Sequence, residues 1–135
     1  MPRVLAELWL YGQLSAVPGL AGRVANGRWT GDEAAPWAVF QMVAEVARGA
    51  IGQPATVAEL RYQAEAVCPG ESTLPIEAIA AAMDAAIDGA AEELPGGVTL
   101  TCQRIGGIPR THSYDGDRVW SHMGSEWTIA VLGIG

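Results

Sequence analysis

The segment VAELRYQAEAV, residues 57–67, alternates apolar and polar side chains more regularly than any other part of the sequence. The apolar positions are Leu60, Tyr62, Ala64 and Ala66, and the polar positions between them are Glu59, Arg61, Gln63 and Glu65. Because successive side chains of a strand point to opposite faces, this period of two predicts a strand with one buried face. The polar face suits either solvent or a subunit contact, and alternation alone does not separate these readings.

Three further strands are expected around this segment. Residues 37–46 (WAVFQMVAEV) are rich in β-branched and aromatic residues and predict a strand buried on much of both faces. Residues 98–105 (VTLTCQRI) alternate again, and a last strand is expected from Arg118 to Leu132, broken near Gly124. Two dipeptides, Arg23-Val24 and Arg28-Trp29, are short extended candidates.

Two connections separate these strands. Residues 48–56 (RGAIGQPAT) contain two glycines and a proline and predict a loop. Residues 106–117 predict a second, polar loop that ends in the turn former Asp115-Gly116-Asp117.

Two helices are expected. Residues 4–14 place Val4, Leu5, Leu8, Trp9 and Tyr11 at helical spacings, and we expect this stripe to enter the core before Pro18-Gly19 ends the helix. A second helix is predicted from Leu74 to about Glu93, with Thr73 as N-cap and Pro75 in the first turn. Its apolar stripe is Ile76, Ile79, Ala80, Met83, Ile87, Ala90 and Leu94, and its polar face carries Glu77, Asp84, Asp88 and Glu92.

The predicted element order is therefore α-β-β-α-β-β. Consecutive strands tend to pair as hairpins, which gives an α+β fold with an antiparallel sheet of four to five strands packed against two helices. At 135 residues the chain has the size of one domain, and we expect residues 1–135 to form a single domain.

The charge composition argues against tight nucleic-acid binding. The net charge is −7, and the eight basic residues are all arginines scattered from Arg3 to Arg118 without a cluster. An acidic surface would let DNA slide past, because like charges repel. No stretch approaches the ~20 apolar residues of a membrane span, so we expect no membrane partner.

Residues able to support chemistry are few. His112, Ser113, Asp115 and Asp117 crowd one predicted loop, and His122 follows, but no metal-ligand spacing and no G-x-S-x-G elbow accompany them. Cys68 and Cys102 belong to no C-x-x-C pair; Cys102 is expected to fill the core, and a disulfide between the two would need an oxidising compartment. We therefore expect no enzyme, no bound metal and no cofactor.

Five tryptophans suggest a division between core and contact surface. Trp9, Trp37 and Trp127 fall on apolar faces, whereas Trp29 and Trp120 stand beside charged and glycine-rich stretches. Since exposed tryptophan is enriched at interfaces, Trp29 and Trp120 are candidate anchors for a partner.

The order of these elements and several short motifs resemble the tail-terminator (tail-completion) proteins of long-tailed bacteriophages. The resemblance covers nearly the whole chain. It consists of Gly22-Arg23-Val24, residues 36–43 (PWAVFQMV), residues 59–63 (ELRYQ), the alanine-rich helix over 76–91, residues 97–100 (GVTL) and the closing residues 127–131 (WTIAV). The chain departs from the family pattern in its short 48–56 loop and in its lack of lysine, which puts a basic docking face in doubt.

This resemblance implies a structural virion protein with no catalytic residues. Such a protein forms a ring, commonly of six subunits, that caps the tail tube at its head-proximal end and docks the head-side connector. The implied partners are further copies of the chain, the tail tube protein and the connector or stopper. Genomic DNA would pass through the lumen without specific binding. The implied location is the tail or neck of the virion, assembled in the host cytoplasm.

A ring needs two different contact patches on each subunit. We expect them in the 48–56 and 106–117 loops together with the two tryptophan anchors. The candidate interface residues are Trp29, Arg48, Gln53, Arg110, Tyr114, Asp115, Arg118 and Trp120.

Three other functions are compatible with the sequence. The first is another neck or tube protein of the phage tail. The second is a small ligand-binding or hydrolytic domain that uses the loop from His112 to Asp117. The third is an adaptor or antitoxin-like module that acts as a dimer.

Overall fold

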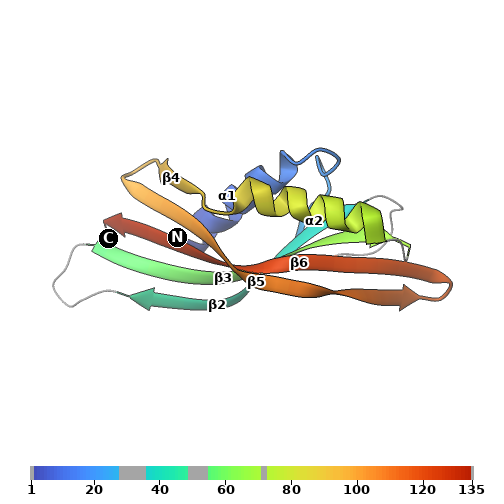
Figure 1. Cartoon of the computed structure of the whole chain (residues 1–135). Coiled ribbons are helices and arrows are strands. Elements are labelled where there is room, and N and C mark those ends of the chain that lie inside the picture. The colour runs from blue at the N-terminus through green and yellow to red at the C-terminus, as the bar shows by residue number, and fades with distance from the viewer. Residues whose placement is uncertain (1, 28–35, 49–54, 71–72, 135) are drawn as a thin grey trace.

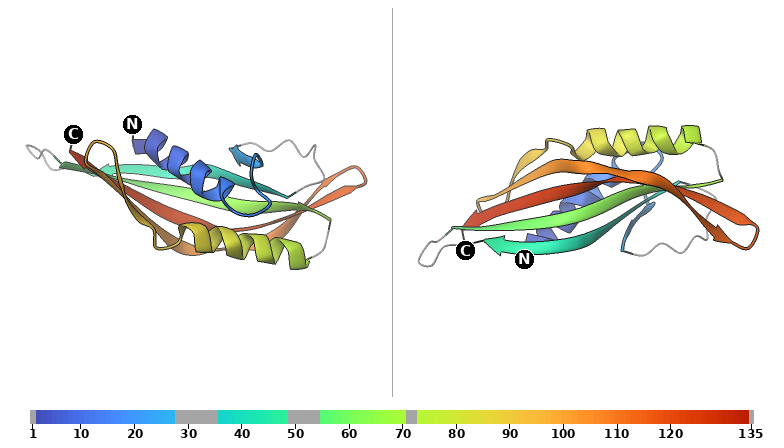
Figure 2. Two further views of the ribbon diagram at one scale, coloured as in Figure 1. Left: turned by 90° about the horizontal axis from the view of Figure 1, so that it is seen from above. Right: turned by 60° about the horizontal axis from the view of Figure 1, so that its bottom comes forward.

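A computed structural model describes residues 2–27, 36–48, 55–70 and 73–134. Its elements, in chain order, are α1 (Pro2–Ser15), β1 (Val24–Asn26), β2 (Trp37–Arg48), β3 (Ala55–Pro69), α2 (Thr73–Ile87), β4 (Ala91–Leu94), β5 (Val98–Asp115) and β6 (Arg118–Ile134). Both helices lie side by side on one face of a long, twisted sheet (Figures 1 and 2).

The sheet has six strands in the order β1-β2-β3-β6-β5-β4. Five of them, from β2 to β4 in this order, are antiparallel to their neighbours, whereas β1 runs parallel to β2 with Val24 opposite Ala38. The predicted fold class, an antiparallel sheet of four to five strands in an α-β-β-α-β-β order, is therefore wrong. The sheet has six strands because two short strands, β1 and β4, join the four long ones, and it is mixed because β1 pairs with β2 in parallel.

The centre of the sheet is the antiparallel pair β3–β6, which runs in register from Ala55 opposite Ile134 to Pro69 opposite Trp120. The predicted break at Gly124 is absent, and β6 is continuous through it. A Cβ at Gly124 would meet the backbone of β3 at Ala64 O and, at 2.7 Å, at Glu65 Cα. Glycine at this position therefore allows β3 and β6 to approach closely.

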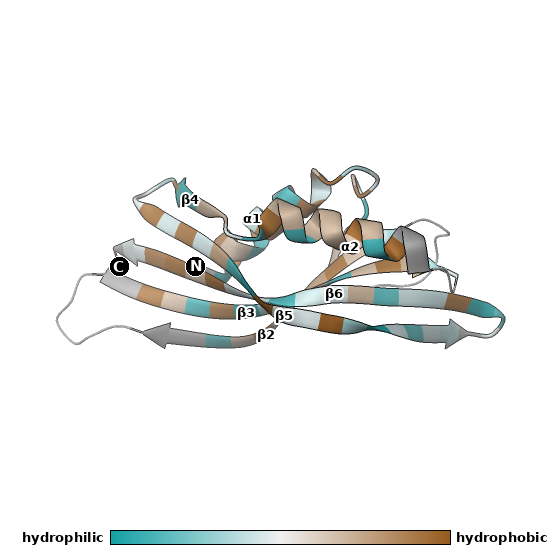
Figure 3. Cartoon of the chain, in the orientation of Figure 1, coloured by the Kyte–Doolittle hydropathy of each residue, from teal (hydrophilic) through white to brown (hydrophobic). Residues whose placement is uncertain are grey.

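The core fills the space between the helices and the sheet. The predicted alternation of β3 is confirmed, because Leu60, Tyr62, Ala64 and Ala66 are all buried toward the helices. Tyr62 contacts Phe40 of β2, with ring centroids 6.2 Å apart. Brown apolar segments alternate with teal polar ones along the strands in Figure 3. This pattern is the expected one for a sheet with one covered face.

The prediction that β2 is buried on much of both faces is wrong. Ala38 and Phe40 enter the core, whereas Val39 is only partly buried and Val43, at an irregularity in the β2–β3 pairing, is 49% exposed. Neither α1 nor α2 covers the side of β2 that Val39 occupies (Figure 2). Trp37 is likewise only partly buried, while Trp9 and Trp127 lie in the core as predicted.

α1 forms where predicted, but it buries a different stripe. Ala6, Trp9, Leu10 and Leu14 face the core, while Val4, Leu8 and Tyr11 are exposed, Leu8 at 66%. The expected stripe was wrong in these three positions because an evenly apolar helix offers two stripes, and tertiary packing selects one of them.

α2 begins at Thr73, one residue before the expected first residue Leu74, and its stripe of Ile76, Ala80, Met83 and Ile87 is buried. Its predicted end near Glu93 is wrong. Gly89 adopts a left-handed conformation (φ 71°) and donates its N–H to Cys102 O at 3.0 Å, which turns the chain away from the helix. The next residues form β4, where Glu92 and Glu93 stand on an edge strand beside β5.

The predicted polar loop at 106–117 is wrong. β5 continues to Asp115 and pairs with β6 as far as Arg118, so only Gly116 and Asp117 form the turn. The polar residues of this segment lie on a hairpin that extends past the end of α2 (Figures 1 and 2). Their pairing with β6 satisfies the backbone, which their polarity alone did not indicate.

Candidate functional site

The face of the sheet opposite the helices, hereafter the helix-free face, bears the polar side chains of the central strands. Gln63 and Glu65 of β3 stand there, opposite Glu126 and Gly124 of β6. β5 adds threonines at 99, 101 and 111 in register with β6. This face also carries an open hollow.

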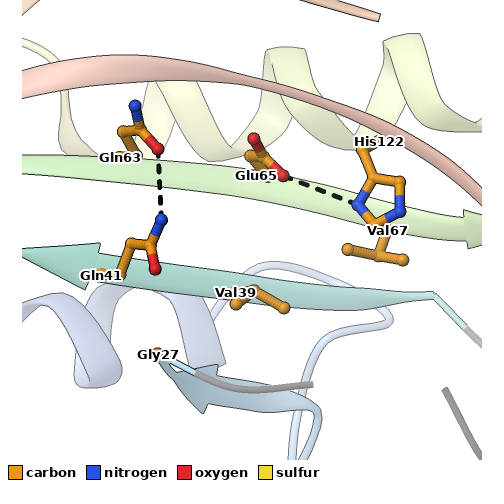
Figure 4. A pocket seen from close by; sticks show the side chains of 7 residues that line it. All are labelled: Gly27, Val39, Gln41, Gln63, Glu65, Val67 and His122. Carbon is orange, nitrogen blue, oxygen red and sulfur yellow. Dashed lines mark hydrogen bonds and ion pairs between the residues drawn. The ribbon is translucent and has the colours of Figure 1, made fainter. Parts of the chain in front are cut away.

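This hollow is an open concavity of about 240 Å³ that crosses β2, β3 and β6. The residues that line it are Gly27, Val39, Gln41, Gln63, Glu65, Val67 and His122 (Figure 4). Gln41 Nε2 donates to Gln63 Oε1 at 3.3 Å, which holds the two amides at one end, while Glu65 and His122 stand at the other. The concavity thus combines carbonyl and carboxylate acceptors with the apolar surfaces of two valines.

Beside the concavity, Ser113, His122 and Glu65 lie in a row. Ser113 Oγ is 2.7 Å from His122 Nε2, and His122 Nδ1 is 3.6 Å from Glu65 Oε2. A serine, a base and an acid in this order suggest a hydrolase triad. However, 3.6 Å is too long for a hydrogen bond, so the carboxylate does not fix the imidazole, and Ser113 does not line the concavity.

The proposed convergence of His112, Ser113, Asp115 and Asp117 in one loop does not occur. His112 and Ser113 are neighbours on a strand and therefore point to opposite faces of the sheet. The side chain of Asp115 is outside the described residues. Within the described side chains, no group of three or more His, Cys, Asp or Glu is close enough to hold a metal ion.

On the helix side, a polar cluster that the sequence did not indicate ties α2 to the sheet. Ser125 Oγ donates to Asp84 Oδ1 at 3.1 Å, and Arg104 Nε donates to Ser125 Oγ at 3.0 Å. Arg104 Nε also lies 3.6 Å from Asp84 Oδ2. Burial raises the pKa of Asp84, and the Ser125 hydrogen bond and the Arg104 charge offset part of that rise. Asp84 was expected on the polar face of its helix, and in the fold it joins α2 to β6 through Ser125 and to β5 through Arg104.

The cysteines are free and buried, Cys68 on β3 and Cys102 on β5. Burial raises the pKa of both thiols, that of Cys102 to about 12. Neither is therefore a reactive thiolate at neutral pH. The expectation that Cys102 fills the core is confirmed.

Three of the predicted interface residues are exposed on the outer part of the β5–β6 hairpin. Tyr114 is 68% exposed, Arg110 is exposed in the irregular stretch between Ile108 and Thr111, and Arg118 lies 5.9 Å from the centre of the Trp120 ring. The hairpin thus places a tyrosine and two guanidinium groups on one projection.

The other predicted interface residues are dispersed or not described. Trp120 is only 4% exposed, so the expectation of an exposed anchor there is wrong, because its neighbours on the folded sheet cover the ring. Trp29 and Gln53 lie outside the described residues, as do the side chains of Arg48 and Asp115. The backbone of Arg48 is at the far end of β2 from the hairpin turn.

The sheet has two open edges. β4 covers β5 from Val98 to Thr101, the segment 88–90 hydrogen-bonds Cys102 and Arg104, and no described strand pairs with the outer side of β5 beyond Arg104. On the other side, β1 covers β2 only at residues 38–40. Unpaired strand edges are templates for pairing with another chain.

The family described as Tail completion protein gp17 matches residues 9–128. The chain belongs to this family. The expected kinship with phage tail-completion proteins is thereby confirmed. Membership assigns a structural role in the phage tail, a location in the tail of the virion and contacts with other tail components. Curated proteins give no match to the sequence.

Among the described helices, none is both long enough and apolar enough to cross a membrane.

Proposed function

We propose that this tail-completion protein is the tail terminator: a ring of identical subunits, six in number, that caps the tail tube at the end that meets the head. In this role it stops polymerisation of the tube and provides the surface on which the head-side connector docks. Its partners are its own copies, the tail tube protein and the connector, and residues 1–135 act as one domain.

The observation that carries the ring is the pair of open edges on opposite sides of one sheet. The outer side of β5 and the side of β2 beyond Phe40 are different surfaces with different sequences. When the β5 edge of one copy meets the β2 edge of the next, the contact is head-to-tail, and a head-to-tail contact closes into a ring if the rotation allows. Strand addition at an edge provides affinity through the main chain.

The exposed hairpin residues supply a second element of contact. All three residues are exposed, Tyr114 and Arg118 next to the hairpin turn and Arg110 further along β5, where a neighbouring subunit or the tube can reach them. Tyrosine and arginine are enriched at the centres of interfaces. We assign these three residues to subunit or partner contacts.

The charge of the chain supports passage of DNA without binding. Each copy carries a net charge of −7 and no lysine. An acidic ring repels phosphates rather than gripping them, so DNA moves through the lumen without specific contacts.

The ring can be tested by measuring the mass of the purified protein with native mass spectrometry and sedimentation velocity. Val43→Lys places a charge on the edge strand β2, which should weaken association by about tenfold or more, because a charge at a strand edge opposes pairing. Leu132→Lys is the matched control, since Leu132 is 44% exposed but lies on the interior strand β6. A wild-type protein that stays monomeric at high concentration would refute the ring.

The position of the ring is tested in the phage. Particles that lack the protein should have tails of irregular length that do not join heads, and electron microscopy of intact particles should place the ring between tube and connector. A position along the tube or at its far end would favour another tube or neck protein instead.

A further inference from the structure

The concavity on the helix-free face has the chemistry of a site for an arginine side chain. Glu65 Oε2 lies 3.6 Å from His122 Nδ1, and the other carboxylate oxygen of Glu65 has no partner among the described residues. The Gln41 amide donates its nitrogen to Gln63, so the carbonyl oxygen of Gln41 is directed elsewhere (Figure 4). A guanidinium binds a carboxylate and a carbonyl together, and apolar walls such as Val39 and Val67 suit its methylene stem.

A second copy of the chain can supply this arginine. All basic residues of the chain are arginines, and most of those whose side chains are described are already engaged. Arg3 pairs with Glu7, Arg104 pairs with Asp84, and Arg23 donates to a backbone carbonyl. Arg118 lies over Trp120. Arg61 stands on β3 itself, four residues before Glu65.

Arg110 is the remaining described arginine. It is exposed and has no ion-pair or hydrogen-bond partner among the described residues. It occupies an irregular stretch of β5, where the pairing with β6 shifts register between Ile108 and Thr111. Such bulges redirect side chains away from the regular face of a strand.

The positions of the two groups fit a ring. Glu65 pairs with Gly124, which in turn pairs with Ile108, so the concavity and Arg110 stand at the same height along the strands. They lie toward opposite edges of the sheet, because Arg110 is on β5 and the concavity crosses β2, β3 and β6 beside β1, which covers β2 at residues 38–40. In a closed ring each copy is related to the next by a rotation about the ring axis, without a shift along it. If the strands run parallel to this axis, two groups that meet between neighbouring copies must lie at the same height along the strands.

We propose that Arg110 of one copy enters the concavity of the next copy, where its guanidinium pairs with Glu65 and donates a hydrogen bond to the carbonyl oxygen of Gln41. This inference rests on the proposed ring and adds the residues that set its register. Each subunit therefore contacts two neighbours: its own Arg110 binds in the concavity of one, and its concavity binds the Arg110 of the other.

Charge reversal tests the pairing. Arg110→Glu and Glu65→Arg should each weaken association roughly 30-fold or more, as the loss of one partner of a buried interfacial charge pair does. The double variant, with both changes in one chain, should recover rings. Rings should also return when the two single variants are mixed, because alternating copies then place Glu beside Arg at every contact, which requires an even number of subunits.

The controls are charge reversals at two residues of the helix-free face that the proposal does not involve. Arg61→Glu matches Arg110→Glu, and Glu126→Arg matches Glu65→Arg. Circular dichroism and thermal unfolding establish that each variant folds, and Arg110→Gln and Glu65→Gln replace any variant that does not.

The outcomes separate this inference from the proposed function. Rings that persist in Arg110→Glu or Glu65→Arg overturn the pairing and leave the ring intact. Loss of rings in both variants without recovery in the mixture also overturns the pairing. A wild-type protein that forms no ring overturns both proposals.

Discussion

The two faces of the sheet are built from the same strands, yet they are organised by different interactions. On the helix side, apolar residues such as Leu60 and Trp127 are excluded from water by α1 and α2, and burial of apolar surface stabilises this side. On the helix-free side, Gln63, Glu65 and Thr128 are exposed or half-buried, and their polar groups are available to another molecule. The comparison shows that the helix side stabilises the fold, whereas the polar groups of the helix-free side are available for contacts with other molecules.

Substitutions on β6 should show the largest difference in the free energy of unfolding between the two faces. Trp127→Ala removes a side chain that is 1% exposed, and it should lower the free energy of unfolding by about 4 kcal/mol, as large aromatic-to-alanine changes in cores do. Thr128→Ala, one residue further on the helix-free face, should change it by about 0.5 kcal/mol or less. Urea unfolding followed by circular dichroism measures both. Equal losses would show that the faces do not differ as described.

A second test addresses the contact between the two central strands, which both faces share. Gly124→Ala should destabilise the fold by about 3 kcal/mol, because the new Cβ meets the backbone of β3 and a strand must move. Gly106→Ala on the neighbouring strand is the control, since nothing lies within 4 Å of the Cβ it would add. Thermal unfolding of both variants compares them directly, and an unchanged Gly124→Ala protein would contradict the close approach.

A smaller effect concerns the polar group on the helix side. Burial raises the pKa of Asp84 in the folded state, so between its unfolded pKa and its folded pKa the folded protein binds more protons than the unfolded chain. Stability from this group is therefore lost as the pH rises through that interval. The free energy of unfolding of the wild type minus that of Asp84→Asn should increase as the pH falls from 7 to 4.

That difference isolates Asp84 because all other titrating groups are common to both proteins. A flat or decreasing difference would mean that the Ser125 hydrogen bond and the Arg104 charge outweigh burial.

The smallest effect is expected for the exposed Leu8 of α1, and the contrast between exposed and buried positions exists within this one helix. Leu8→Ala should alter the free energy of unfolding by about 0.5 kcal/mol or less, since Leu8 is exposed. Leu10→Ala should cost about 3 kcal/mol, because Leu10 is fully buried. Chemical unfolding of the pair would sharpen the comparison, and a large loss in Leu8→Ala alone would reverse it.

Periodic segments were predictable from their residues. The alternation of β3 and the stripe of α2 each have a single solution that buries their apolar side chains, so local pattern and tertiary structure agree. α1 was predictable as a helix but not in its orientation, because its sequence offers more than one apolar stripe. Gly89 was a signal for the early end of α2, since glycine is the usual residue of a helix C-terminus.

Other elements depend on partners that are distant in sequence. β1 has only three residues, and it is a strand because Ala38–Phe40 of β2 pair with it. The outer half of β5 is polar on both faces, so no periodicity marked it, and β6 supplies the pairing that makes it a strand.

The sequence by itself determined the helix-side core, the long central strands, the acidic charge and the kinship with tail-completion proteins. These properties follow from local periodicity, composition and motif order, which each segment carries alone. Only the tertiary structure decided the mixed six-stranded sheet, its two open edges and the concavity that joins Gln41, Glu65 and His122. These features arise from pairing between strands far apart in the chain, and no single segment contains the information about its neighbours.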